Sequence, residues 1–265
     1  MVTSVQNNRY YTYNGEEYKR RSDGEEALGY LLATAASGLV VKALPSFSNP
    51  FLKQMKKEHG NNHLYKDAFF KSFEQSGLKD KGVKFIDAAF SPVASADIRA
   101  GLNACYIPDA GQVVLNSEKA TISGFHELGH AMNHLQSKFG KLLQKARVPG
   151  YYIAGLMGTV AILSRRKPEG APRNAWDWVQ DNCGKIAFAA MLPTVAEEAL
   201  ASHKGIKLAK SVGLSQHVVN NLKKFYGKAL LSYLGYALVT GVSVYAASKI
   251  TEIFTRPKKI NPNNH

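Results

Sequence analysis

The stretch FHELGH at residues 125–130 decides how the rest of the chain is interpreted, because it contains the pattern HExxH. On a helix, residues four apart lie on one face, so the imidazoles of His126 and His130 can bind one metal ion. Zinc binds imidazole nitrogen and has no geometric preference of its own. Glu127 then projects toward a metal-activated water and can act as its general base. The sequence therefore predicts a zinc-bearing helix.

The surrounding residues support a long, partly buried helix. Residues 117–119 mark its start, and we expect it to run to about Gly140. His134 follows His130 by four residues, but it would lie about 12 Å along the axis from His126, too far to share one ion. We therefore expect His134 on the helix face or in support of a ligand. The apolar side of the helix consists of Phe125, Leu128, Ala131, Met132 and Leu135.

The third metal ligand must come from another part of the chain, and the adjacent pair Glu197 and Glu198 is the best candidate. The pair follows the apolar run 186–196 and has no basic neighbour before Lys204. In a helix only one of two adjacent carboxylates can face the metal. The residues alone leave the choice between Glu197 and Glu198 open.

Three segments in order resemble the membrane-embedded gluzincins, the zinc peptidase family of the bacterial HtpX heat-shock protease and the CAAX prenyl protease. They are NACYIP at residues 103–108, VVLN at 113–116 and the HELGH motif. The resemblance extends over about residues 100–212. It implies an edge strand beside the substrate, and two apolar segments between the motif and the third ligand.

The same resemblance assigns the downstream residues. Glu198-Ala199-Leu200-Ala201 fits the family pattern ExxA, which implies Glu198 as the third ligand and Glu197 as its neighbour. Ser202 stands where the family has an Asp that supports a ligating histidine. Either Ser202 or His203 would have to provide that support here.

Apolar residues gather in four stretches that predict membrane helices. Residues 229–248 suffice to cross a bilayer, which takes about 20 apolar residues. Residues 148–164 are at the short limit, and residues 27–44 would span if Lys42 reached the interface. Residues 186–196 are too short alone. The alternative is that these are buried helices of a soluble protein.

The net charge of +14 indicates an anionic partner. No nucleic-acid-binding motif is present, so we expect membrane lipids and no nucleic acid. We expect a multi-pass membrane protein with its active site facing the cytoplasm, and the two cysteines fit a reducing compartment. The basic clusters that flank apolar ends are 19–21, 165–167, 223–224 and 256–259.

These features together predict an α+β fold that is mostly α, with a zincin-like HExxH helix, a small sheet edge and several transmembrane helices. We expect a polar, mobile tail at 1–26 with a turn at Asn14-Gly15, and a basic tail at 256–265. The range 27–255 would form a single membrane-associated metallopeptidase domain. Within it, residues 46–50 predict a loop, and residues 83–86 and 112–116 predict strands.

The expected function is that of a zinc-dependent endopeptidase, with one Zn²⁺ per chain and a protein or peptide substrate. An extended substrate would pair with the strand at 112–116. A tyrosine or histidine near the third ligand would bind the oxyanion, and His203 is a candidate. One alternative is a zinc-containing membrane scaffold or chaperone without peptidase activity. Another is a basic binding module in which HELGH is incidental.

Overall fold

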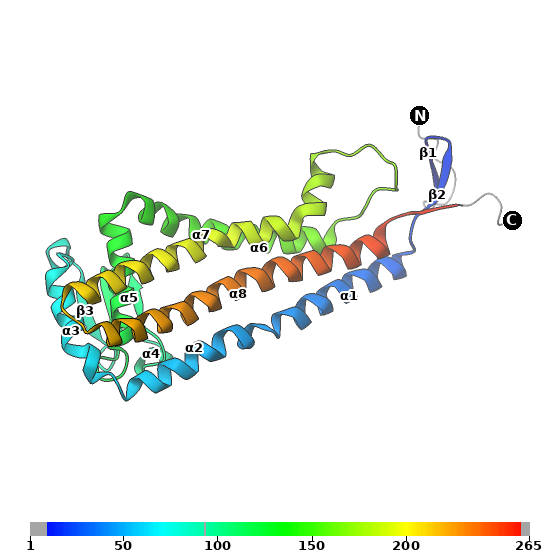
Figure 1. Cartoon of the computed structure of the whole chain (residues 1–265). Helices are drawn as coiled ribbons and strands as arrows, with labels where there is room; N and C mark the ends of the chain where they lie inside the picture. Colours follow the sequence, from blue (N-terminus) through cyan, green and yellow to red (C-terminus); the bar gives the residue numbers. More distant parts are fainter. Residues whose placement is uncertain (1–9, 93, 261–265) are drawn as a thin grey trace. The chain divides into compact units, whose positions relative to one another are not determined.

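The computed structural model describes residues 10–92 and 94–260 (Figure 1). In this range the chain is mostly helical and contains two small three-stranded sheets, which confirms the predicted α+β class. The sequence suggested one domain over residues 27–255, whereas the chain separates into two compact units. The bundle unit comprises Met1–Ala43, Tyr151–Met191 and Ala237–His265, and the HExxH unit comprises Leu44–Gly150 and Leu192–Tyr236.

The sheet of the HExxH unit has the strand order β3-β5-β4. Strand β5 (Gln112–Leu115) pairs in parallel with β3 (Lys84–Asp87) and antiparallel with β4 (Cys105–Ile107). Both edges of β5 are therefore occupied, and the expectation that a substrate would pair with residues 112–116 is wrong. Strand β4 lies at the edge, because within the described residues it pairs with β5 alone.

Helices α2 (Leu44–His59) and α3 (His63–Gln75) precede this sheet, and the predicted loop at 46–50 is wrong. Pro45 lies in the first turn of α2, where backbone N–H groups have no intrahelical partner, so a proline is tolerated there. Pro50 lies inside the helix and removes one backbone hydrogen bond without ending it. The 3₁₀ helix η1 (Lys79–Lys81) and helix α4 (Ala96–Arg99) complete this part of the unit.

Helix α5 (Thr121–Gln136) carries the HExxH motif and is buried along most of its length. The Phe125 ring packs edge-on against Phe69 of α3, with ring centroids 6.0 Å apart. The Tyr226 hydroxyl donates a hydrogen bond of 2.7 Å to the Ile122 carbonyl. The motif helix is thus held inside the hydrophobic core of its unit, which fixes the position of the histidines.

Three long helices contribute to both units: α6 (Lys138–Leu163), α7 (Ala175–Ser211) and α8 (Gln216–Thr255). In the bundle unit, α8 lies beside α1 (Asp23–Val41), as the Ser37 hydroxyl donates to the Ser243 carbonyl (Figure 1). Gly184 of α7 and Gly241 of α8 face each other so closely that an added Cβ on Gly184 would lie 2.8 Å from the Gly241 carbonyl oxygen. Small residues permit this approach of two backbones.

The first described residues form a hairpin where the sequence predicted a mobile tail. Strands β1 (Tyr10–Tyr13) and β2 (Glu16–Lys19) pair antiparallel through a turn at Asn14-Gly15, and both turn residues have positive φ. Such a turn matches the twist of the two strands. Strand β6 (Lys258–Lys259) adds to β2, and the remainder of the predicted basic tail, 261–265, lies outside the described residues.

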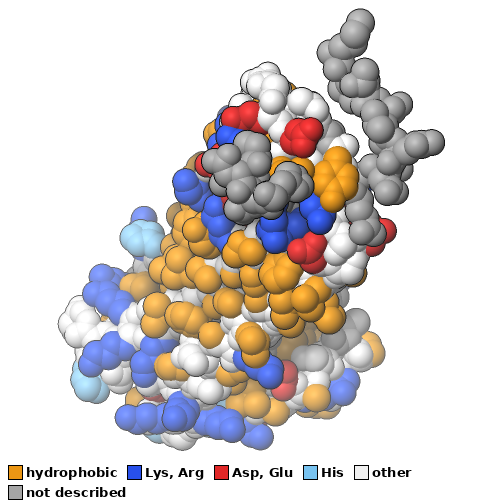
Figure 2. Space-filling model, turned by 90° about the vertical axis from the view of Figure 1, so that its right-hand side faces the viewer, with side chains coloured by type: hydrophobic (Ala, Val, Ile, Leu, Met, Phe, Trp, Pro, Cys, Tyr) orange, Lys and Arg blue, Asp and Glu red, His pale blue; other side chains and the backbone are white. Residues whose placement is uncertain are grey.

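Within residues 10–92 and 94–260, three helical stretches are long and apolar enough to cross a membrane, by length and composition: Asp23–His59, Lys138–Leu163 and Gln216–Thr255. They contain three of the four apolar runs, and the fourth, 186–196, lies in α7. Large apolar side chains point outward from the bundle unit, with Leu31 67% and Leu156 57% exposed. Figure 2 shows a broad hydrophobic patch bordered by Lys and Arg. Exposed apolar surface of this extent is typical of a membrane-contacting protein.

Candidate metal centre

Three electron-pair donors converge at the centre of the HExxH unit. The Nε2 atoms of His126 and His130 lie 2.9 Å apart. The Oε2 atom of Glu198 lies 3.0 Å from the first of these nitrogens and 3.4 Å from the second. Ligands at the zinc–nitrogen distance of about 2.0 Å in a tetrahedral site lie about 3.3 Å from one another. The spacing of the three atoms therefore matches that of ligands around one small ion.

Close backbone packing between α5 and α7 creates this convergence. An added Cβ on Gly129 would overlap the backbone carbonyl of Ala201. One helical turn along, an added Cβ on Gly205 would lie 2.5 Å from the Phe125 carbonyl oxygen. Both contacts require glycine, and together they bring the carboxylate of Glu198 within reach of the histidines.

Glu197 faces the opposite nitrogen of His130. Its Oε1 atom lies 2.8 Å from His130 Nδ1 and accepts hydrogen bonds from Asn133 at 2.9 Å and Gln144 at 3.0 Å. Burial would raise the pKa of Glu197, but the contacts with His130 and Asn133 hold that pKa below its usual value. Glu197 therefore orients the His130 ring through its Nδ1 atom, while Glu198 points at the Nε2 atoms of both histidines.

Arg147 of α6 contacts both carboxylates. One guanidinium nitrogen lies 2.9 Å from Glu197 Oε2 and the other lies 3.1 Å from Glu198 Oε1. Glu198 is buried, which by itself raises its pKa, yet its contacts with His126 and His130 hold the pKa well below its usual range. Glu198 is thus an ionised carboxylate, as a metal ligand must be.

The remaining nitrogen of His126 is held by Ser202, whose hydroxyl lies 3.1 Å from His126 Nδ1. This is one of the two residues that the sequence named for such support, and the other, His203, is exposed. His134 lies away from the three donors, with its Nδ1 atom 3.0 Å from the Tyr106 hydroxyl. That position agrees with the expectation that His134 is not part of the converging set.

Glu127 completes the cluster, since one of its carboxylate oxygens lies within 4.8 Å of ring nitrogens of both His126 and His130. Burial raises the pKa of Glu127, and a hydrogen bond from the Tyr106 backbone N–H acts in the opposite direction. A carboxylate with a raised pKa holds a proton more readily than an exposed one.

The charge of the cluster favours a cation at its centre. Burial lowers the pKa of His130, but the hydrogen bonds to Glu197 and Glu198 outweigh this effect and raise the pKa to about 10. Three buried carboxylates around two imidazoles therefore form a site that attracts positive charge.

Several residues of the cluster carry no signal in the sequence. Asn133, Gln144 and Arg147 all reach Glu197 or Glu198, and a motif search does not find them because their spacing follows no known pattern. Tyr233 of α8 also interacts with the Glu198 carboxylate. A helical-face argument could have linked Gln144 and Arg147, which lie three residues apart, but not to Glu197.

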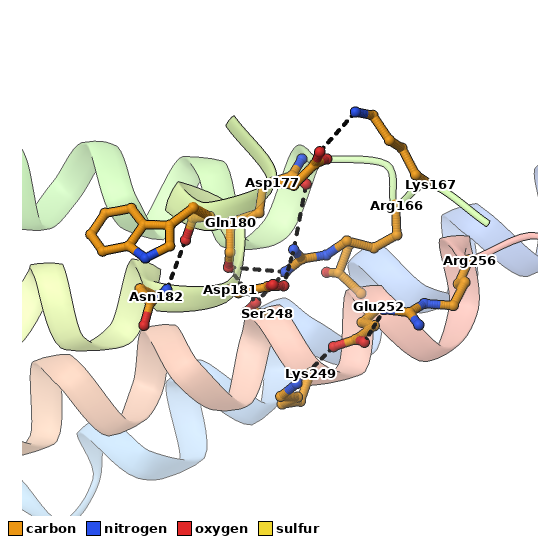
Figure 3. A network of polar contacts seen from close by, with 12 residues as sticks. Arg166, Lys167, Asp177, Gln180, Asp181, Asn182, Ser248, Lys249, Glu252 and Arg256 are labelled. Carbon is orange, nitrogen blue, oxygen red and sulfur yellow. Dashed lines mark hydrogen bonds and ion pairs between the residues drawn. The ribbon is translucent and has the colours of Figure 1, made fainter. Parts of the chain in front are cut away.

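A second buried polar cluster lies in the bundle unit (Figure 3). The Arg166 guanidinium reaches the Asp181 carboxylate at 3.1 Å, the Gln180 carbonyl at 3.1 Å and the Ser248 hydroxyl at 2.5 Å. Within the described residues, both groups of side chains that could hold a metal ion lie in the HExxH unit. Among the described residues, the Arg166 cluster therefore contains no set of converging metal donors.

In comparisons with known proteins, no family model, curated protein or solved structure matches this chain. The resemblance to membrane-embedded gluzincins accordingly rests on the sequence motifs.

Proposed function

We propose that this protein is a zinc-dependent endopeptidase whose metal ligands are His126, His130 and Glu198. The observation that carries the proposal is the convergence of the two Nε2 atoms and one carboxylate oxygen at ligand spacing, with Glu127 beside them. Two imidazoles and a carboxylate form one of the donor sets of catalytic zinc sites, in which a fourth position remains open. When bound, zinc supplies an acidified water and polarises a carbonyl oxygen.

Glu127 is the proposed general base. It takes the proton of the attacking water and delivers it to the amine that leaves when the peptide bond breaks. Its buried position raises its pKa, which suits a group that must both accept and release a proton. Glu197 and Ser202 orient the two histidines through their Nδ1 atoms, so that both Nε2 atoms point at the same place.

The substrate would bind along β4 in an extended form. This strand is the edge of its sheet, and the backbone of its residue Tyr106 already contacts Glu127. An extended peptide that adds to such an edge would place its own backbone carbonyls beside the proposed base. This assignment replaces the central strand at 112–116.

Tyr233 is the proposed donor to the oxyanion. Its side chain interacts with Glu198 from α8, and a phenol hydroxyl can stabilise the negative charge that develops on a carbonyl oxygen. His203, the candidate from the sequence, is exposed. Tyr233 is therefore the better candidate for this role.

We further propose a multi-pass membrane location with the HExxH unit on the cytoplasmic side. Three helical stretches suffice to cross a membrane. The HExxH unit carries 20 Lys and Arg against 11 Asp and Glu, a net charge of +9 out of the total +14. Segments rich in Lys and Arg are retained on the cytoplasmic side and are attracted to anionic headgroups.

The test is hydrolysis of fluorescein-labelled casein by the purified full chain in detergent, with and without zinc. We expect zinc-dependent cleavage, and we expect Glu127→Gln to reduce it by about 10²–10⁴-fold while zinc stays bound. Zinc binding without cleavage of casein or of an unfolded membrane-protein substrate would instead favour the scaffold or chaperone alternative. Equal activity in Glu127→Gln would refute the role of the proposed base.

A further inference from the structure

Arg147 divides the four oxygens of the carboxylate pair between two tasks. The Oε2 atom of Glu197 and the Oε1 atom of Glu198 face the guanidinium, at 2.9 and 3.1 Å. The Oε1 atom of Glu197 then faces His130 Nδ1, and the Oε2 atom of Glu198 faces the two Nε2 atoms. Because one oxygen of Glu198 is held by Arg147, a single oxygen is left to point at the metal position.

The charge of Arg147 also balances the site. Glu127, Glu197 and Glu198 are all buried, and three carboxylates at close range repel one another. With neutral histidines, three carboxylates, one guanidinium and one divalent ion sum to zero. A buried cluster of charges is tolerated when its members are paired and hydrogen-bonded.

The guanidinium is suited to this task by its shape. Its planar fork presents two parallel N–H donors, one to each carboxylate, and a lysine ammonium at the same place would act as a point charge. The Arg147 side chain is 28% exposed, so it is anchored by these contacts and not by complete burial.

We propose that Arg147 is a positioning residue of the metal centre. By bridging Glu198 to Glu197, it leaves Glu198 one oxygen with which to bind the metal. The inference rests on the proposed metal site and adds to it a residue from α6, outside the HExxH motif and the Glu pair. In this proposal, the two-armed contact of Arg147 with Glu197 and Glu198, and not its positive charge alone, determines that Glu198 binds the metal through one oxygen.

The decisive variant is Arg147→Lys, which retains the charge and removes the bridge. Zinc affinity is measured by competition with a chelator, and the ligand geometry is read from the visible spectrum of the Co²⁺-substituted protein. We expect about a 10-fold loss of zinc affinity, in the range typical for groups that support a ligand. We also expect weaker cobalt absorption, because the freed oxygen of Glu198 joins the ion and raises its coordination number.

Arg99→Lys is the matched control, because it makes the same change in the same unit at a residue whose side chain donates to the Ser91 carbonyl, away from the Glu197 and Glu198 carboxylates. It should leave zinc affinity and the cobalt spectrum unchanged. Circular dichroism of both variants checks that the helices are retained, and if Arg147→Lys does not fold, Arg147→Gln, which keeps a planar donor, takes its place.

The outcomes separate this inference from the proposed function. If the wild-type chain binds zinc and cleaves casein, and Arg147→Lys has wild-type affinity and spectrum, the inference is wrong and the proposed function stands. If the wild-type chain binds neither zinc nor cobalt, the proposed function itself fails. A loss of affinity with a changed spectrum in Arg147→Lys alone supports the bridge.

Discussion

In the described part of the chain, Arg166 and Arg147 each lie in a polar cluster, and the two clusters differ in whether their acceptors converge on one point. In the bundle unit, Arg166 is enclosed by groups that accept its hydrogen bonds, among them Asp181 and Ser248. In the HExxH unit, Arg147 occupies one side of two carboxylates, and the histidines and Glu198 still direct electron pairs at a common point. The terminal nitrogens of Arg166 are paired with acceptors of the protein, whereas the acceptors of the HExxH unit converge on a point where we propose that a cation binds.

The comparison shows that burial and charge do not by themselves mark a site. Both arginines lie among acidic partners, and the Arg166 side chain is the more buried, at 4% exposed against 28% for Arg147. The Arg147 cluster differs in that it contains two imidazoles. Glu197 and Ser202 contact the Nδ1 atoms of these rings and so orient them. The Arg166 cluster joins donors to acceptors, whereas the proposed metal centre gathers acceptors around one point.

We expect the largest effect on zinc affinity from a substitution at the close contact between α5 and α7. Gly129→Ala places a methyl group against the Ala201 backbone, so α5 and α7 must separate and Glu198 moves away from the histidines. We expect zinc affinity to fall by at least about 100-fold, measured by chelator competition. Gly227→Ala is the control, since its methyl would meet open space. Unchanged zinc binding in Gly129→Ala would contradict this account of the helix contact.

The next largest effect should be on the stability of the protein and not on zinc binding. Arg166→Met removes the buried guanidinium that bonds Asp181, the Gln180 carbonyl and Ser248. Arg173 still pairs with Asp181, so we expect a loss of about 2 kcal/mol in the free energy of unfolding. Zinc affinity should not change, because the Arg166 contacts found among the described residues all lie in the bundle unit. The exposed Lys249→Met, which breaks a surface ion pair with Glu252, should cost less than about 1 kcal/mol. A loss of zinc in Arg166→Met would show that the clusters are coupled.

We expect the smallest effect from the loss of the hydroxyl that supports His126. Ser202→Ala removes the hydroxyl that faces His126 Nδ1, so the ring loses its preferred orientation. We expect about a 10-fold loss of zinc affinity with little change in thermal stability of the metal-free protein. Ser211→Ala, in the same helix and with its hydroxyl on the Leu208 carbonyl, is the control. Equal zinc affinity in Ser202→Ala would mean that the hydroxyl does not support this ligand.

Much of the arrangement follows from the sequence. The HExxH spacing places His126 and His130 on one helical face, and the structure brings both to Glu198. The long apolar runs predict helices that could cross a membrane, and the described part of the chain contains three such stretches. These features depend on local periodicity and length, which a sequence displays directly.

Other features depend on contacts that no local pattern encodes. The order β3-β5-β4 is set by β4, a three-residue strand in a segment rich in Gly and Pro, so the sequence did not reveal that the strand at 112–116 is central. Pro50 lies within α2, where a proline is expected to end or kink a helix, so the local signal for a loop at 46–50 misled the prediction. Arg147 reaches a carboxylate 50 residues further along the chain, through the packing of α6 on α7.

We propose that Glu198 binds the metal and that Glu197 orients His130. Metal analysis of single variants tests these two roles most directly. Zinc is measured by mass spectrometry in the wild-type chain and in Glu198→Ala and Glu197→Ala, each equilibrated with excess zinc and then desalted. We predict about one zinc per chain in the wild type, none in Glu198→Ala, and zinc that is retained but more weakly held in Glu197→Ala. Zinc kept in Glu198→Ala and lost in Glu197→Ala, or no zinc in the wild type, would contradict it.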